Sequence, residues 1–245
     1  MSNWTQPGLR LMRQLHPVSF HERFVASGTY TYYNGDTPAG DVERWTLHEP
    51  GAGSLTIRAD YDGRTDSSID WLFEGLAVET GGHWRIERFD LLALGHTVKT
   101  EAKFVFSPEG AEISPRVDGE PQAVIRVAAT GPFEVASPAL VARYWFLQNL
   151  PRQAGSVEIF EAGLDPASGV LHGGHISTAS VEPLGQPVPV TTADAGESQG
   201  FRIGRPDGEA IRCWLNARWI PVYWESSSGQ SARLTEYTHR PERSA

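Results

Sequence analysis

Cysteine is almost absent from the chain, since Cys213 is the only one. This excludes an intramolecular disulfide, so burial of side chains must stabilise the fold. Scarce cysteine fits a reducing compartment, and we expect a cytoplasmic location. Cys213 lies between Arg212 and Trp214 in a strand-like stretch. A buried structural thiol is favoured there over a reactive one, because no histidine adjoins it in the sequence.

Long apolar runs are missing as well. No stretch approaches the ~20 residues of a membrane-spanning helix, and Arg10 and Arg13 interrupt the region where a signal peptide would be continuously apolar. Basic residues are outnumbered, with 21 Lys and Arg against 30 Asp and Glu and a formal net charge of −9. This balance argues against nucleic acid and an anionic membrane surface as partners. We therefore expect an acidic, soluble protein without membrane insertion.

The familiar catalytic signatures are also absent: there is no GxSxG elbow, no phosphate-binding GxxxxGK motif, no HExxH and no CxxC. We accordingly expect no cofactor. The most metal-like cluster is His172-Gly-Gly-His175, where two imidazoles could ligate zinc together with a carboxylate. A glycine-rich turn with two solvated histidines is favoured instead, because no third ligand with convincing spacing is nearby. No metal is expected.

Turn-forming residues are abundant, with 25 glycines and 17 prolines that recur about every ten residues. Such spacing is typical of an antiparallel β meander. Within Val98–Phe106 the apolar side chains alternate with Lys99, Glu101 and Lys103, which indicates one buried and one wet face. We predict roughly fourteen strands in one domain spanning residues 1–245, with 1–16 and 238–245 as terminal arms. A division near residues 130–150 is the alternative.

One segment breaks the β rhythm. Ser137 is a candidate N-cap followed by Pro138, and Leu140, Tyr144 and Leu147 then recur at helical spacing. This predicts one short helix near residues 138–148, buried against the sheet or across a barrel mouth. The number of strands fits an enlarged barrel, a half-barrel clasping the helix, or two lipocalin-like sheets in series. The predicted fold is thus all-β, a large antiparallel meander forming a lipocalin-like barrel or half-barrel.

Aromatic residues are the strongest functional signal. The stretch Ile211–Glu225 reads as two consecutive strands, broken by Asn216 and Pro221, and it contains four large aromatic side chains. An aromatic-lined cavity for a lipid, isoprenoid, polyketide or aromatic compound and a well-filled β core explain this load equally well. If a cavity exists, the candidate ligand-binding residues are Trp71, Arg143, Tyr144, Trp214, Trp219 and Tyr223.

Charged residues stand among bulky apolar ones in two predicted strands. Asp70 and Glu74 share a face of one strand. On the next strand, Arg88 and Asp90 share the face of Trp84 and Ile86, which must point inward. Inside a cavity, burial would make the carboxylates usable as general acid or base, and Arg88 would hold an anionic group. A solvent-facing surface with cross-strand ion pairs is the favoured alternative.

The part of the chain from Arg143 onward resembles a bacterial β-rich family of unknown function, related in shape to lipoprotein-carrier half-barrels and lipocalin-like barrels. The resemblance is carried by a run at Arg143–Leu147, a strand at Val157–Ala162 and the late strands containing Trp214-Leu215 and Ile220-Pro221-Val222. It implies an extended antiparallel sheet curled around a hydrophobic groove. It carries no catalytic residue across.

Three hypotheses follow from the sequence. The first is a β cavity that binds a hydrophobic small molecule as carrier or sensor. The second is a cofactor-free isomerase, cyclase or dehydratase that uses a buried Asp or Glu on a hydrophobic substrate. The third is an assembly protein whose apolar groove takes a partner segment. An apolar cavity would favour the first, inward carboxylates the second, and an open groove with a bare edge strand the third.

Overall fold

The computed structural model describes residues 12–63, 69–150, 154–165, 168–190, 192–193 and 196–240. Of the expected terminal arms, residues 1–11 and 241–245 lie outside the described residues. Over the described residues the chain forms sixteen strands that belong to one sheet. The strands are β1 (Arg23–Asn34), β2 (Thr37–Gly51), β3 (Ser54–Asp62), β4 (Asp70–Thr80), β5 (His83–Leu94), β6 (Lys99–Ser107), β7 (Gly110–Val117), β8 (Glu120–Pro121), β9 (Ile125–Ala128), β10 (Glu134–Ala136), β11 (Gly155–Leu164), β12 (Leu171–Leu184), β13 (Ser198–Gly204), β14 (Ala210–Asn216), β15 (Pro221–Ser226) and β16 (Gln230–His239).

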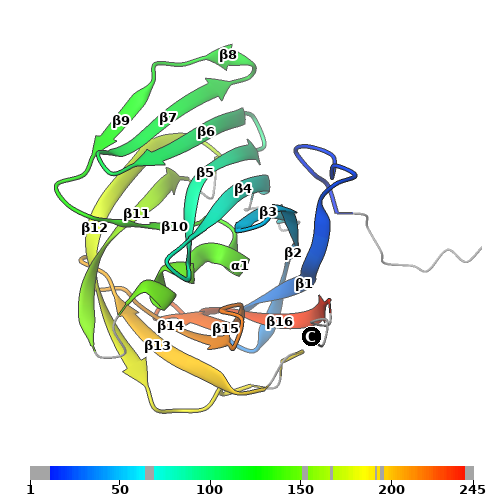
Figure 1. Cartoon of the computed structure of the whole chain (residues 1–245), viewed down its shortest axis with the longest axis vertical. Coiled ribbons are helices and arrows are strands. Elements are labelled where there is room, and N and C mark those ends of the chain that lie inside the picture. The colour runs from blue at the N-terminus through cyan, green and yellow to red at the C-terminus, as the bar shows by residue number, and fades with distance from the viewer. Residues whose placement is uncertain are drawn as a thin grey trace, which may run out of the picture.

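The sheet is a long meander that curls around a central helical segment (Figure 1). Its hydrogen-bonded order runs β10-β11-β12-β13-β14-β15-β16-β1-β2-β3-β4-β5-β6-β7-β8, and β9 pairs with β7. All neighbours are antiparallel except β10 and β11. This confirms the predicted all-β class. Because the path begins at β10 and ends at β8 without joining, the sheet is a curled, hydrogen-bond-open barrel.

The curled sheet has two arms, one containing β4, β5 and β6 and the other containing β11. Aromatic packing joins these arms where strand hydrogen bonds do not. Phe73, Phe89 and Phe104 follow one another across β4, β5 and β6, with ring centroids 5.2 and 4.2 Å apart. Phe160 of β11 lies on the opposite arm, 6.2 Å from Phe104 and 5.1 Å from Phe106. Burial of such rings contributes roughly 2–3 kcal/mol each. The interior is therefore closed by side chains rather than by a strand pair.

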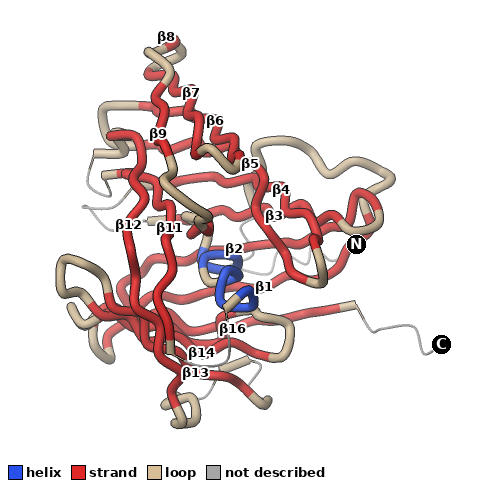
Figure 2. Tube along the Cα trace, turned by 60° about the vertical axis from the view of Figure 1, so that its left-hand side comes forward, coloured by secondary structure: helices blue, strands red, loops and turns tan. Residues whose placement is uncertain are grey.

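The helical segment lies inside the curl, with β11 and β12 on one side and β1 and β2 on the other (Figure 2). It consists of one α turn, α1 (Leu140–Arg143), and a 3-10 turn, η1 (Trp145–Asn149), rather than the continuous helix that was predicted. Tyr144, with φ −110° and ψ 14°, interrupts the α conformation between them. The predicted N-cap is also wrong: Ser137 accepts a bond from the N–H of Ala139, the actual N-cap.

The predicted late pair of strands is confirmed as β14 and β15, joined by a turn from Asn216 to Ile220. The side-chain oxygen of Asn216 accepts the N–H groups of Arg218 and Ile220, at 2.9 and 3.1 Å. Trp219 adopts φ +61° within this turn, a region that bulky residues rarely enter. Two hydrogen bonds to one amide oxygen hold the backbone in this conformation. Pro221 is the first residue of β15, a strand position that proline tolerates although it has no N–H to donate.

At one end of the curled sheet, Gly95 makes a close backbone contact with the turn that contains Ser168. Gly95, after β5, packs so closely on the turn before β12 that a Cβ would lie 2.0 Å from the carbonyl oxygen of Ser168. We predict that Gly95→Ala lowers the free energy of unfolding by about 1–3 kcal/mol, because backbone must move to relieve the overlap. Gly185→Ala is the control, since an added Cβ there meets nothing within 4 Å. Equal urea midpoints for the two variants would contradict the contact.

Candidate functional site

A cavity of about 650 Å³ opens at one mouth of the curled sheet. The ends of several strands form its wall, and the segment before and within α1 forms its floor. Its lining comes from distant parts of the sequence: Tyr32, Tyr33, Asn34, Ala39, Asp41, Tyr61, Ile69, Trp71, Ala136, Ser137, Pro138, Arg143, Glu161, Ala162, Leu164, Arg205, Trp224 and Gln230. The volume is in the range of small-molecule sites.

One wall of this cavity is aromatic. Tyr61 of β3 and Trp71 of β4 are register partners on neighbouring strands, so both point to the interior. Their rings stack at 5.2 Å with an interplanar angle of 3°. The ring of Tyr32 meets Tyr61 edge-on at 5.4 Å. The three rings hold one another in place and give the wall apolar area against which a planar or aliphatic ligand body can pack.

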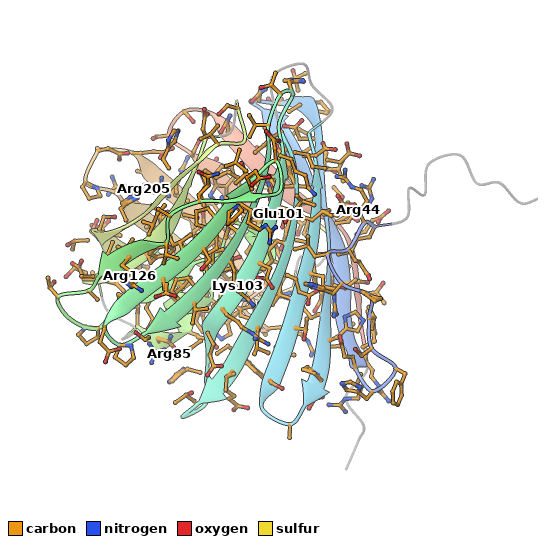
Figure 3. All side chains as sticks on the ribbon, turned by 90° about the horizontal axis from the view of Figure 1, so that it is seen from above. Arg44, Arg85, Glu101, Lys103, Arg126 and Arg205 are labelled. Carbon is orange, nitrogen blue, oxygen red and sulfur yellow. The ribbon has the colours of Figure 1, made fainter. Side chains whose placement is uncertain are left out.

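Two arginines stand among the cavity-lining residues. Arg143 of α1 is half-buried, and its guanidinium donates to the carbonyl oxygens of Ser137, at 3.1 Å, and Pro138. Arg205 follows β13 and pairs with Glu161 and Glu209. Figure 3 shows Arg205 towards one end of the strands and Arg85 towards the other. The cavity thus combines an aromatic wall with the cation of Arg143, whereas the charge of Arg205 is paired with Glu161 of the same lining.

A fully buried carboxylate lies directly behind the cavity wall. Glu43 of β2 has no exposed surface. Its Oε2 accepts the hydroxyl hydrogen of the cavity-lining Tyr32 at 2.8 Å, and its Oε1 accepts the N–H of Leu140 at 2.8 Å. Burial raises the pKa of Glu43 from 4.5 to about 7, although these bonds and the charge of Arg143 oppose the rise. Glu43 can therefore hold or release a proton near neutral pH.

The structure places Asp70 and Glu74 on the outer face of the sheet, away from the cavity. Arg13, in the segment before β1, donates to Asp70 at 2.7 Å and to Asp60 at 2.6 Å. Arg58 donates to Glu74 at 3.0 Å. The pair of Arg58 and Glu74 is a cross-strand ion pair of the kind favoured from the sequence, whereas the contacts of Arg13 with the sheet were not expected. A catalytic role for either carboxylate stays a prediction.

The predicted inward placement of Arg88 and Asp90 is wrong. A β-bulge interrupts the pairing of β4 and β5, where Leu76 faces Arg88 but Ala77 faces Ile86. The extra residue, Glu87, shifts the alternation by one position. Ile86 stays buried before the bulge, whereas Phe89 takes the inner face after it. Arg88 is consequently exposed, and Asp90 faces Glu74 and Lys103 on the outer side.

Two of the six predicted ligand-binding residues, Trp71 and Arg143, line the cavity. Tyr144 and Trp214 are buried, and the Trp214 indole donates to the carbonyl of Gln186 at 3.0 Å. Tyr223 is also buried, with its hydroxyl bonded to Glu225 at 3.0 Å. Trp219 borders a different hollow, beside Leu215 and Asn216. A ligand contact by these four stays a prediction from sequence.

Sequence reasoning missed Tyr32, Tyr61, Glu43 and Arg205. A signal for Glu43 was present: it alternates with Trp45 and Leu47, which places a carboxylate on the apolar face of a predicted strand. Nothing in the local sequence marks Arg205, because its position depends on the curl of the whole sheet.

The two histidines of the predicted metal-like cluster lie in β12, and not in the glycine-rich turn that was favoured. Both side chains are exposed, and Nε2 of His175 is 3.9 Å from Glu161. Among the described residues, no group of three or more His, Cys, Asp or Glu is placed to hold a metal ion. No helix in this part of the chain is long and apolar enough to cross a membrane.

A second hollow lies at the opposite mouth. Trp84, Phe106 and Trp145 form part of it, and Arg85 and Glu134 bring charge to it. Residues 136–138 and Arg143 border the first cavity, whereas residues 133–135, Trp145 and Phe146 border the second. The helical segment therefore separates the two ends of the interior.

Titration of Glu43 should affect stability. Its folded-state pKa is raised, so the folded protein binds more protons than the unfolded chain between about pH 4.5 and pH 7. The contribution is fully present below that window and is lost as pH rises through it. We predict that the free energy of unfolding falls by about 3 kcal/mol across the window relative to Glu43→Gln.

The measurement is urea denaturation at several pH values, with Glu120→Gln, on the exposed strand β8, as the control. A wild-type profile parallel to that of Glu43→Gln would show that Glu43 does not titrate in this range.

Comparisons with known proteins give one structural likeness. No protein-family model matches the chain, and no curated protein matches it at a significant level. Among solved structures, the chain is similar to one described as a beta-barrel-like protein of domain of unknown function DUF1849 from Brucella abortus, with 9% sequence identity and a TM-score of 0.49. The match covers 90% of this chain and 100% of that chain. It carries no residue role across, and the relation to lipoprotein-carrier half-barrels stays a prediction.

Proposed function

We propose that the chain binds a small amphipathic molecule, with an apolar or aromatic body and an anionic group, in the cavity at the mouth of the curled sheet. The observation that supports this proposal is the cavity of about 650 Å³, in which stacked Tyr61 and Trp71 lie in the same lining as Arg143. This proposal refines the hydrophobic ligand expected from the sequence, because the lining is not uniformly apolar.

The lining explains both parts of the proposed ligand. The fixed rings of Tyr32, Tyr61 and Trp71 offer apolar area that gains free energy when water leaves it, about 25 cal/mol per Å². Arg143 is held by two backbone carbonyls, which fix its position but do not neutralise its charge. A cation with reduced access to water attracts an anion more strongly than one on the surface does.

Catalysis on the same scaffold is the second candidate. The specific observation in its favour is the hydrogen bond of 2.8 Å between cavity-lining Tyr32 and buried Glu43, since a buried carboxylic acid beside a phenol can exchange protons with a bound substrate. Isomerisation or dehydration would then depend on Glu43 rather than on Asp70, Glu74, Arg88 or Asp90. A cytoplasmic location, the absence of a cofactor and an assembly role stay predictions from the sequence.

The first experiment is native mass spectrometry of the purified protein, followed by identification of any compound that dissociates from it. We predict an amphipathic acid bound with one-to-one stoichiometry.

A binding probe tests the site directly. Anilinonaphthalene sulfonate joins aromatic rings to a permanent anion, and its fluorescence rises in apolar surroundings. We predict that Ala162→Trp, which fills the cavity from β11, weakens binding of this probe at least about tenfold. Val105→Trp adds the same ring on the outer face of β6, where the side chain is 46% exposed, and should leave the affinity unchanged. Equal affinities for the two variants would show that the probe binds elsewhere.

A further inference from the structure

We propose that an anionic ligand binds this cavity together with a proton, which is taken up by Glu43 and makes the hydroxyl of Tyr32 a donor to the ligand. The inference rests on the proposed function, since it concerns the same cavity. It adds a specificity-determining pair, Tyr32 and Glu43, and it names the ligand class as an acid that the site receives as anion plus proton.

The direction of the hydrogen bond between Tyr32 and Glu43 depends on whether Glu43 is ionised. An ionised carboxylate can only accept, so Tyr32 must donate its hydrogen to Oε2 of Glu43, 2.8 Å away. In this state the hydroxyl has no hydrogen left for a ligand. An anion in the cavity would instead meet the oxygen lone pairs of Tyr32, and that contact is repulsive.

Protonation reverses the bond. Oε1 of Glu43 accepts the N–H of Leu140 at 2.8 Å, and a backbone bond from Val141 also reaches the carboxylate. The proton is accommodated on Oε2, the oxygen that faces the hydroxyl of Tyr32. The new O–H then donates to the oxygen of Tyr32, and the phenolic hydrogen is released to turn into the cavity that Tyr32 lines. No heavy atom needs to move by more than a fraction of an ångström, because the same two oxygen atoms stay bonded.

The charges around Glu43 support the same coupling. Groups that face it from neighbouring elements are Tyr30 and Tyr32 on β1, Tyr61 on β3 and Arg143 on α1. Asp41 lies two residues away on β2 and accepts the hydroxyl of Tyr61 at 2.9 Å. Arg143 is the cation of this set, and an anionic ligand would compete with Glu43 for it. Neutralising Glu43 removes that competition and removes a buried negative charge next to the ligand.

The pH dependence follows with a definite sign. Burial raises the pKa of free Glu43 to about 7, so the ligand-free site is mostly ionised at about pH 8. A bound anion raises this pKa further, and binding at that pH therefore takes up a proton. Above about pH 7 the affinity for the anion should fall by up to about tenfold per pH unit.

Calorimetric titration of the full chain with anilinonaphthalene sulfonate tests the proposal, because the sulfonate itself does not titrate in this range. The titration at about pH 8 is repeated in phosphate and in Tris buffer, whose heats of ionisation differ. We predict uptake of 0.5 to 1 proton per bound probe for the wild type, as an approximate range.

Two substitutions separate the partners. In Glu43→Gln the amide oxygen can accept from Leu140 and the amide nitrogen can donate to Tyr32, which imitates the protonated acid. This variant should take up no proton and should bind at about pH 8 as tightly as the wild type binds at about pH 6. Tyr32→Phe should bind more weakly than the wild type at about pH 6 and should take up fewer protons per bound probe than the wild type, because Glu43 and Arg143 remain but the hydroxyl that responds to Glu43 is gone.

The outcomes distinguish a failure of the proton linkage from a failure of ligand binding in the cavity. If Ala162→Trp blocks the probe but wild-type binding takes up no proton, the proton linkage is wrong and ligand binding in the cavity stands. If Glu43→Gln keeps the wild-type pH profile, the proton belongs to another group and the proposal is overturned. If Ala162→Trp has no effect at either pH, the cavity is not the binding site and both proposals fail.

Discussion

The bond between Glu43 and the first turn of α1 is the constraint on which the interior depends. A chain segment that crosses the inside of a curled sheet brings backbone N–H groups away from water, and each must find an acceptor. The N–H of Leu140 finds it in the carboxylate of Glu43, 97 residues earlier in the chain. This bond joins α1 to β2, and Tyr32 extends the link to β1. The position of α1, in turn, sets the cavity floor and places Arg143.

The open path of the sheet makes this internal link more important. In a closed barrel, strand pairing alone would fix the distance between opposite walls. Here β10 and β8 end the hydrogen-bonded path, so the two arms are held by Phe104, Phe106 and Phe160 and by the helical segment between them. Nonpolar contacts keep the arms together but do not fix one register. A hydrogen-bonded carboxylate does, because its bonds have direction as well as energy.

Much of the fold could be predicted from the sequence because alternation and turn chemistry are local. Lys99 and Lys103 are exposed as expected, while Thr100, Ala102 and Phe104 are buried. The turn at Asp118-Gly119 has positive φ at both residues, as its sequence indicates. The bulge at Glu87 could not be predicted, because it depends on how β4 and β5 share the curvature of the sheet, and it reversed the faces assigned to Arg88 and Asp90.

The candidate site was less predictable than the fold for the same reason. Its lining residues converge only when the strand ends meet at one mouth, and no local pattern encodes that meeting. Trp71 was found because an aromatic residue on an apolar face is visible in sequence, whereas Arg205 was not. In sequence, Tyr32 stands beside Tyr30 and Tyr33, and core packing is the ordinary explanation of such a group. Only the bond from its hydroxyl to a buried carboxylate distinguishes it from an ordinary core tyrosine.

Carboxylates on the outer face of the sheet and the buried carboxylate of Glu43 have different partners, and their roles differ accordingly. Glu74 on the outer face is paired with Arg58, and Asp60 is paired with Arg13. These outer carboxylates accept charge-assisted hydrogen bonds from guanidinium groups. Glu43 is buried without a direct arginine bond among those the structure shows, and its partners are the Tyr32 phenol and the backbone N–H groups of Leu140 and Val141. The outer carboxylates therefore serve to fasten the N-terminal segment to the sheet, while Glu43 retains the capacity to exchange a proton beside the cavity.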